Sequence, residues 1–142
     1  MYHHSHQLRI RYSETDQMGY VYYGNYAAFL ELGRVETLRS LGISYKSLEE
    51  KGVMLPVVHF SINYKSPAKY DDLIVVKTTI TQMPTAKILF DYEVLSAEGN
   101  LLADAHTMLV FMDDSTRRPI KCPEAIISAL QAYYSDEPPT LA

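Results

Sequence analysis

The chain has 142 residues, of which 47% are hydrophobic and 21% charged, and this composition excludes a disordered, collagen-like or disulfide-stapled protein. Its length suits one domain and is too short for two of ordinary size, so we expect a single domain over residues 1–142 with its core in residues 8–134. With 13 Lys and Arg residues against 17 Asp and Glu residues, the net charge is −4, which repels polyanions and argues against a nucleic-acid partner.

Cysteine content and hydropathy indicate the compartment. Cys122 is the single cysteine, so the chain forms no internal disulfide, as is typical of a reducing compartment. Apolar runs are only a few residues long, far below the roughly 18 residues that span a bilayer, and residues 1–6 lack the apolar stretch of a signal peptide. We therefore expect a cytoplasmic protein without a membrane span.

The first part of the chain predicts a strand followed by a long helix. Apolar residues alternate with arginines over residues 8–12, a period of two that predicts a strand with one buried face. Apolar residues then recur at three- and four-residue steps, which predicts a helix over residues 25–41 that ends at Gly42. Gly33 costs such a helix about 1 kcal/mol relative to Ala, so we expect it to allow close approach of another backbone.

The rest of the chain predicts mainly strands. Residues 44–51 predict a short helix, and residues 83–86 and 98–100 predict hairpin turns, so we expect an antiparallel meander paired in sequence order. The expected strands are 57–64, 72–82, 87–97 and 101–112, followed by a closing helix over 124–134 and a frayed tail over 136–139.

This order of elements predicts an α+β fold, with one antiparallel sheet packed on one long helix. A single sheet leaves its own edges and the second face of the helix uncovered. Because exposed strand edges are commonly covered by association with another copy, we expect a homo-oligomer.

Candidate chemistry lies in the loop that joins the first strand to the helix. Asp16 occupies this loop, and its structural alternative is a turn-forming aspartate. The backbone amides of Tyr23, Gly24 and Asn25 stand where the helix begins, and first-turn amides have no partner within a helix. They can therefore point at a carbonyl oxygen that gains negative charge. A carboxylate and an oxyanion pocket in one loop suit attack on an activated acyl group.

The same segment carries a recognisable motif. The pattern D-x-x-G-x-V-x-x-x-N-Y-x-x-x-x-E-x-x-R is present at Asp16, Gly19, Val21, Asn25, Tyr26, Glu31 and Arg34. Together with residues 64–72, it resembles the 4-hydroxybenzoyl-CoA thioesterase-like hot-dog proteins, and the resemblance covers residues 8–112. It implies a hot-dog fold, in which a curved antiparallel sheet of about five strands wraps a long central helix. It also implies an acyl-CoA thioesterase whose acyl pocket lies between two subunits of a homodimer or homotetramer.

The resemblance assigns roles to individual residues. Asp16 would be the catalytic carboxylate, acting either as general base on water or as nucleophile, and the backbone amide of Tyr23 would polarise the thioester carbonyl. Gly24, Asn25 and Tyr26 would contact the substrate, although Asn25 also suits a helix N-cap. Further along the chain, Thr85 and Lys87 are the candidates for binding the CoA nucleotide.

Other polar residues have structural interpretations. Glu31 and Arg34 are spaced i to i+3 on the helix, which favours a salt bridge or a dimer contact over catalysis. His59 and His106 are interpreted as isolated structural residues within strands. The histidines among residues 3–6 have no carboxylate or cysteine at ligand spacing, so we expect neither a metal nor another cofactor.

Two alternative functions stay open at this point. A non-catalytic acyl-CoA-binding module would use the same groove, and a thioesterase that acts on acyl groups held by a carrier protein would use the same chemistry. The sequence specifies neither the length of the acyl group nor its aromatic or aliphatic character, because fold does not determine function.

Overall fold

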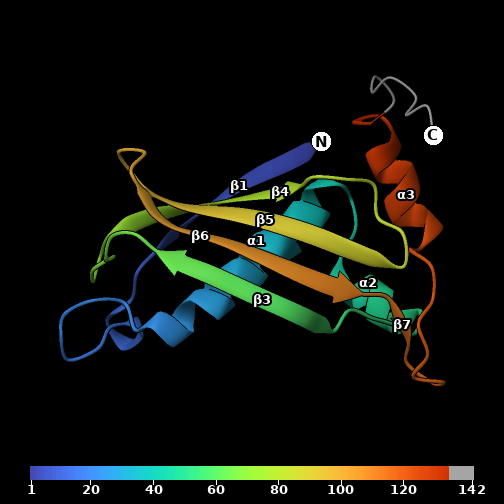
Figure 1. Cartoon of the computed structure of the whole chain (residues 1–142), viewed down its shortest axis with the longest axis horizontal. Helices are drawn as coiled ribbons and strands as arrows, with labels where there is room; N and C mark the ends of the chain where they lie inside the picture. Colours follow the sequence, from blue (N-terminus) through green and yellow to red (C-terminus); the bar gives the residue numbers. More distant parts are fainter. Residues whose placement is uncertain (135–142) are drawn as a thin grey trace.

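The computed structural model describes residues 1–134. One antiparallel five-stranded sheet, in the order β1-β4-β5-β6-β3, covers helix α1 (Tyr26–Ser40), as Figure 1 shows. The remaining elements are the short pair β2 and β7, the helices α2 and α3, and two 3₁₀ turns, η1 and η2. Their bounds are β1 Tyr2–Arg9, η1 Tyr12–Glu14, η2 Tyr23–Asn25, α2 Tyr45–Glu50, β2 Val53–Met54, β3 Val57–Tyr64, β4 Leu73–Ile80, β5 Lys87–Ser96, β6 Leu101–Val110, β7 Met112–Asp113 and α3 Glu124–Gln131.

The expected α+β class and the first two expected helices are confirmed; the closing helix begins at Glu124 as predicted but ends at Gln131 rather than at residue 134. The bounds of the first and second helices lie within one residue of the predicted ones. Their C-terminal ends were predictable because Gly42 and Gly52 follow them, with positive φ angles of 83° and 79°. No helix within residues 1–134 has both the length and the apolarity needed to cross a membrane. The stretch 136–139, expected to fray, lies outside the described residues.

The predicted meander is confirmed for β4, β5 and β6 and wrong for β3. Hairpins join β4 to β5 and β5 to β6, but β3 pairs with β6 on the far side of the sheet, with Tyr64 opposite Ala103. The edge of β4 is instead occupied by β1, which pairs with it over all eight residues. The chain can make this crossing because residues 65–72 form a connection too long for a tight hairpin. β3 is therefore an edge strand, at the lower margin of the sheet in Figure 1.

The first strand begins earlier than predicted. It runs over Tyr2–Arg9, and its residues alternate between half-buried and exposed along the whole strand. This alternation could not be recognised from the sequence, because histidines occupy both half-buried positions (His4 and His6) and an exposed one (His3) and count as polar at each. Ile10 continues the pairing through backbone hydrogen bonds, donating to Asp72 at 2.9 Å and accepting from Asp71 at 3.0 Å. The backbone leaves the sheet before Tyr12, which starts η1.

The core lies between the sheet and α1. Phe29, Leu30 and Leu38 are buried on the face of α1 that meets buried strand residues such as Ile74 and Phe90. Each large apolar side chain buried in this way contributes about 1.5–3 kcal/mol relative to exposure. This layer fixes where α1 begins relative to the strand ends, and so fixes the loop before it.

Gly33 is a point of close approach between α1 and β4, as predicted, although the atoms nearest to it belong to side chains of β4 rather than to its backbone. A Cβ atom at this position would lie 2.7 Å from both Thr78 Oγ1 and Val76 Cγ1 on β4. Both neighbours are β-branched, so neither side chain can move aside easily. The residue is glycine because α1 lies directly against the sheet here.

We expect Gly33→Ala to lower the free energy of unfolding by about 1–3 kcal/mol, because the new methyl group overpacks the contact with Val76 and Thr78. Urea unfolding followed by circular dichroism measures this change. Without the clash, the higher helix propensity of alanine would stabilise the protein by about 1 kcal/mol, so an increase in stability would contradict the packing argument.

Cys122 is buried, and burial raises the pKa of its thiol to about 12. At pH 8 only about one thiol in ten thousand is then a thiolate, the form that reacts with alkylating reagents. We expect iodoacetamide at pH 8 to leave the folded protein unmodified and to label the protein in denaturant, as measured by intact mass. Rapid labelling of the folded protein would show that the thiol is accessible.

Candidate active site

The loop between β1 and α1 is built around the side chain of Asp16. Its Oδ1 accepts hydrogen bonds from the backbone amides of Met18, at 2.9 Å, and Tyr20, at 3.4 Å. The turn also contains Gly19, whose φ of 86° suits glycine. The structural alternative, a turn-forming aspartate, is therefore confirmed. It does not exclude a chemical role, because the described hydrogen bonds of this carboxylate all use one oxygen.

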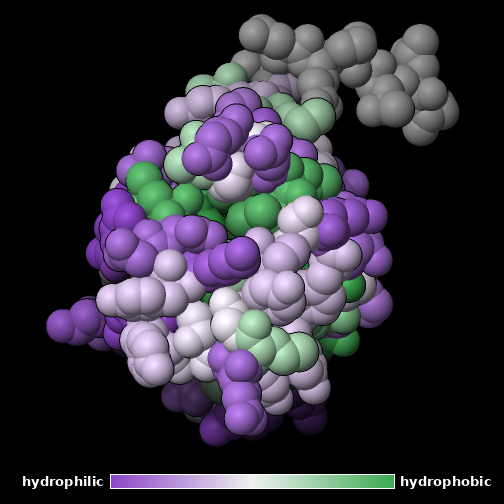
Figure 2. Space-filling model, turned by 90° about the vertical axis from the view of Figure 1, so that its left-hand side faces the viewer, coloured by the Kyte–Doolittle hydropathy of each residue, from purple (hydrophilic) through white to green (hydrophobic). Residues whose placement is uncertain are grey.

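Asp16 also lines a cavity of about 260 Å³ beside the start of α1. Figure 2 faces the end of the molecule that carries this loop, where hydrophilic and intermediate side chains cover most of the surface. The cavity wall combines the carboxylate with aromatic rings and with the segment that follows β3. The lining residues are Asp16, Met18, Tyr20, Val21, Tyr23, Tyr26, Tyr64, Lys65, Ser66 and Pro67.

Four tyrosines line this cavity, and the ring of one of them, Tyr64, contacts those of Tyr23 and Tyr26. The ring of Tyr64 contacts that of Tyr26 with centroids 5.2 Å apart, and its hydroxyl donates a hydrogen bond to the backbone oxygen of Tyr23 at 3.1 Å. Tyr26 is only 3% exposed. Burial, followed by the charge of Tyr64, raises the pKa of Tyr26, so this phenol is neutral at pH 7. The wall is therefore apolar in character with hydroxyl groups at its margin.

The start of α1 is a 3₁₀ turn rather than a standard cap. Asn25 occupies the N-cap position, but its side chain does not cap the helix and instead donates to the backbone oxygen of Glu14 at 2.8 Å. Its backbone amide donates to the oxygen of Tyr22 at 2.9 Å. The predicted capping bond of Asn25 is therefore wrong, and its amide is already used within the turn. The amides of Tyr23 and Gly24 precede it and are the remaining candidates for binding an oxyanion.

The structure thus brings part of the predicted site together. Asp16, Tyr23 and Tyr26 line one cavity, whereas Gly24 and Asn25 lie in the adjacent turn without lining it. A Cβ atom on Gly24 would lie 2.8 Å from the ring of Tyr22, whose side chain is exposed.

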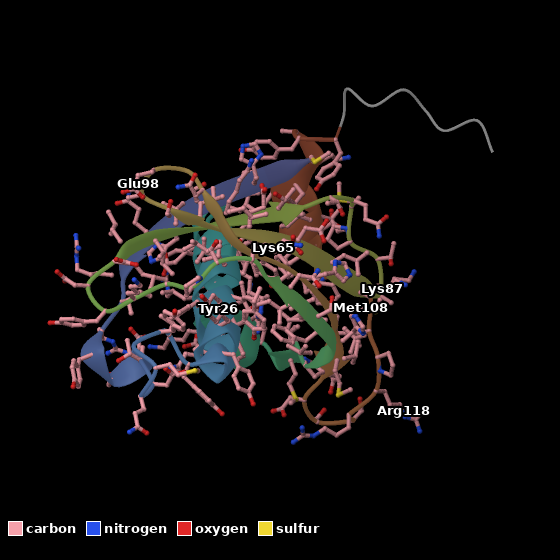
Figure 3. All side chains as sticks on the ribbon, turned by 60° about the vertical axis from the view of Figure 1, so that its left-hand side comes forward. Tyr26, Lys65, Lys87, Glu98, Met108 and Arg118 are labelled. Atoms are coloured by element: carbon pink, nitrogen blue, oxygen red, sulfur yellow. The ribbon has the colours of Figure 1, made fainter. Side chains whose placement is uncertain are left out.

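Thr85 and Lys87 lie elsewhere in the same chain. Lys87 is paired with Val110 at one end of β6, whereas Tyr64 of the cavity is paired with Ala103 at the other end. Figure 3 shows Tyr26 on α1 and Lys87 at the margin of the sheet. Within one subunit, the candidates for binding the CoA nucleotide are therefore separated from Asp16 by the length of the sheet.

Reasoning from the sequence missed Tyr64, Ser66 and Pro67 as site residues and treated Lys65 only as one of several cations available for the CoA phosphates. They belong to the second motif block, 64–72, which marked the segment as important without giving a role. The structure shows that this segment packs against the Asp16 loop, because the amide of Val21 donates to the oxygen of Ala68 at 2.8 Å. Tyr20 also forms a bridge with Lys69.

Two structural interpretations are corrected. Among the ion pairs within residues 1–134, none joins Glu31 to Arg34; Arg34 is buried, with its Nη1 3.5 Å from the hydroxyl of Tyr92. His106 is not isolated either, because its Nδ1 lies 2.6 Å from Asp91 Oδ1 on the neighbouring strand. Its ring also lies 6.1 Å from that of His59. In the described part of the chain, His, Cys, Asp and Glu side chains do not gather in any group of three or more suited to a metal ion.

Comparison with known proteins places this arrangement in a family. The sequence profile of the Thioesterase-like superfamily matches residues 10–130. YneP of Bacillus subtilis is 35% identical over 127 residues, which cover 89% of this chain and 92% of YneP. The acyl-CoA thioester hydrolase YbgC of Escherichia coli is 32% identical over 121 residues, which cover 85% of this chain and 90% of YbgC.

Solved structures confirm the expected hot-dog fold. Slr0204, a 1,4-dihydroxy-2-naphthoyl-CoA thioesterase from Synechocystis, matches with a TM-score of 0.85 and 28% identity, over 96% of this chain and 99% of that protein. The sequence profile extends from the end of β1 into α3, so it includes both the Asp16 loop and the segment that packs against it. The chain therefore belongs to the Thioesterase-like superfamily.

Proposed function

We propose that this protein is a single-domain, cytoplasmic acyl-CoA thioesterase in which Asp16 drives the attack and the start of α1 binds the oxyanion. The observation that carries the proposal is that Asp16 and Tyr23 line the same cavity, at the point where a helix begins. The similarity to the acyl-CoA thioester hydrolase YbgC and to the 1,4-dihydroxy-2-naphthoyl-CoA thioesterase Slr0204 supports a CoA thioester as the substrate. This proposal requires no cofactor.

The proposed reaction needs two groups from the protein. Acting as general base, Asp16 takes a proton from water while the water oxygen bonds to the thioester carbon; the C–S bond then breaks and the CoA thiolate recovers the proton. Acting as nucleophile, the same carboxylate would bond to the thioester carbon while the C–S bond breaks and CoA leaves as the thiolate; water would then hydrolyse the resulting acyl anhydride to the free acid, which restores the carboxylate, and the CoA thiolate would take up the proton that is released. In both routes an amide at Tyr23 or Gly24 stabilises the oxyanion, and one such donor contributes about 100- to 1000-fold in rate.

We further propose a homodimer paired through β3. This strand is at the edge of the sheet, and apolar residues are exposed on it, with Val58 54% and Phe60 41% exposed. Two copies related by a two-fold axis would add β3 to β3 in antiparallel fashion and form one continuous sheet. This pairing satisfies the unpaired backbone groups of the edge and buries its apolar side chains. A further association into a tetramer is compatible with it.

The proposed dimer also accounts for the positions of Thr85 and Lys87. Antiparallel pairing sets the Tyr64 end of one β3 beside the Val57 end of the other. Val57 is paired with Leu109 and Lys87 with Val110, so Lys87 belongs to the Val57 end of the sheet. In the dimer, Lys87 of the partner subunit would therefore approach the Asp16 cavity, where a cation could bind the phosphates of CoA.

The test is a panel of short, long and aromatic acyl-CoAs, with release of CoA followed by a thiol reagent. Hydrolysis of at least one of them supports the enzyme, whereas binding of acyl-CoA without release of CoA would support the binding module. Presenting the preferred acyl group on CoA and on a carrier protein separates the two thioester substrates. We expect the CoA thioester to be the better one.

A further inference from the structure

A second cavity, of about 320 Å³, lies beside the middle of α1, between that helix and the segment that contains α2 and β2. Much of its wall is apolar, formed by side chains between Leu48 and Pro56. Its polar groups come from Glu31 and Arg34 on α1, and from Tyr45 and Glu49 on α2. The proposed reaction uses none of these residues.

Arg34 is the unusual member of this wall. It is only 8% exposed, and its Nε has no hydrogen-bond partner among the described residues. The contact between Nη1 and the hydroxyl of Tyr92 is long, at 3.5 Å. Burial acts to lower the pKa of Arg34, but the phenols of Tyr92 and Tyr45 outweigh it, so the pKa is raised and the guanidinium stays charged.

The neighbouring phenol is also incompletely satisfied. The hydroxyl of Tyr45 is buried without a hydrogen-bond partner within residues 1–134, and burial raises its pKa to about 12. A neutral phenol and a guanidinium both donate hydrogen bonds. The Tyr45 oxygen interacts with the Arg34 guanidinium, but the two groups together carry more buried N–H and O–H donors than the described hydrogen bonds of this wall occupy. Buried donors without an acceptor reduce the stability of the folded state, so this surplus suggests that the missing acceptor is a ligand.

The position of this cavity suggests which ligand. Pro56, on its wall, directly precedes β3, so the cavity lies at the Val57 end of that strand. In the proposed dimer, that end is beside the Asp16 cavity of the other subunit. An acyl group whose thioester is held at the start of α1 would thus extend toward Arg34 of the partner subunit.

We propose that Arg34 and Tyr45 form the polar end of the acyl pocket and select acyl groups that carry a hydrogen-bond-accepting oxygen at their far end. This inference rests on the proposed function and adds the class of acyl group. Both a hydroxyl and a carboxylate offer such an oxygen. Glu31 and Glu49 stand on the same wall and repel a carboxylate, so the experiment compares the two.

The experiment measures kcat/KM for three CoA thioesters of one chain length: hexanoyl, 6-hydroxyhexanoyl and adipoyl. We expect the ratio of an oxygenated substrate to hexanoyl-CoA to fall at least about 10-fold in Arg34→Met, because an acceptor in the pocket then lacks its donor. Hexanoyl-CoA, which has no oxygen at its far end, gives the reference rate within each variant. The 6-hydroxyhexanoyl and adipoyl arms show whether the oxygen is neutral or charged.

Two comparisons separate selection from a structural role. Arg39→Met removes a charge from the same helix at an exposed site paired with Glu36, and it should leave the ratio unchanged. Replacement of a buried charge by an apolar side chain of similar length is commonly tolerated, and thermal unfolding checks that Arg34→Met is folded. A structural role would change the rates on all three substrates together. Equal ratios in Arg34→Met and the wild type would overturn the proposal.

Binding measurements keep this inference distinct from the proposed activity. Calorimetry with Asp16→Asn, alone and combined with Arg34→Met, gives Kd values for the same three thioesters without turnover. If the protein binds acyl-CoA but hydrolyses none, the proposed function fails, while a ratio of Kd values that depends on Arg34 still supports the pocket. A ratio independent of Arg34, or no binding by either variant, overturns the pocket.

Discussion

Asp16→Asn is expected to lower kcat for acyl-CoA hydrolysis by about 100- to 10,000-fold, the range that a positioned general base contributes. The substitution is chosen because Asn keeps an oxygen that can accept the hydrogen bonds from Met18 and Tyr20, so the turn is preserved. What it removes is the negative charge and the ability to take a proton from water or to attack the thioester. CoA release under saturating substrate measures the change.

Asp16→Ala is the companion variant. It removes the charge and the acceptor together, so it should lose at least as much activity and also loosen the loop, while the core keeps its structure because the side chain lies outside it. Circular dichroism and thermal unfolding check the fold of both variants. Wild-type turnover in Asp16→Asn would remove this carboxylate from the mechanism and leave it as a turn former.

The double substitution Val58→Lys with Phe60→Lys is expected to convert the protein into monomers of 16.2 kDa and to reduce kcat/KM by roughly 100-fold or more, even though Asp16 is unchanged. Two lysines on β3 place like charges along the proposed contact and remove its exposed apolar side chains. If the proposed dimer is right, the site then loses the groups that the partner subunit would supply. Analytical ultracentrifugation and the thiol-release assay measure the two effects on the same sample.

Thr79→Lys is the matched control, because it adds a lysine to β4, an inner strand of the sheet. We expect it to change neither the mass in solution nor the activity. A Val58→Lys, Phe60→Lys protein that is monomeric by sedimentation and still hydrolyses acyl-CoA at the wild-type rate would show that each subunit holds a complete site. The proposed role of Lys87 of the partner subunit would then be wrong as well.

The local parts of the site were predictable because they depend on neighbours in the sequence. The turn at Asp16 and Gly19, and the helix that begins after Tyr23, follow from turn chemistry and apolar periodicity within one segment. Gly33 could be predicted as a packing position for the same reason, since a glycine inside a helix costs free energy that close packing must offset.

The predictions that were wrong concern contacts between segments far apart in the sequence. The sequence indicates that residues 57–64 form a strand, but which edge of the sheet they join depends on competition between β1 and β3 for β4, which no local pattern records. The role of Tyr64 depends on that outcome, because only the edge position brings it to the Asp16 cavity. The predicted cap at Asn25 was wrong for a different reason. Its side chain donates to the backbone oxygen of Glu14, eleven residues earlier, instead of capping the helix.

The hydrogen bond from Tyr64 to the oxygen of Tyr23 has an electronic consequence. That oxygen and the N–H of Gly24 belong to one planar peptide group, so the bond draws electron density toward the oxygen and makes the N–H more strongly polarised. Tyr64 is also the last residue of the edge strand. Under the proposed mechanism and dimer, any association that shifts the end of this strand would therefore change how strongly the Gly24 N–H donates, and the Tyr64 hydroxyl would couple assembly to the proposed oxyanion donor.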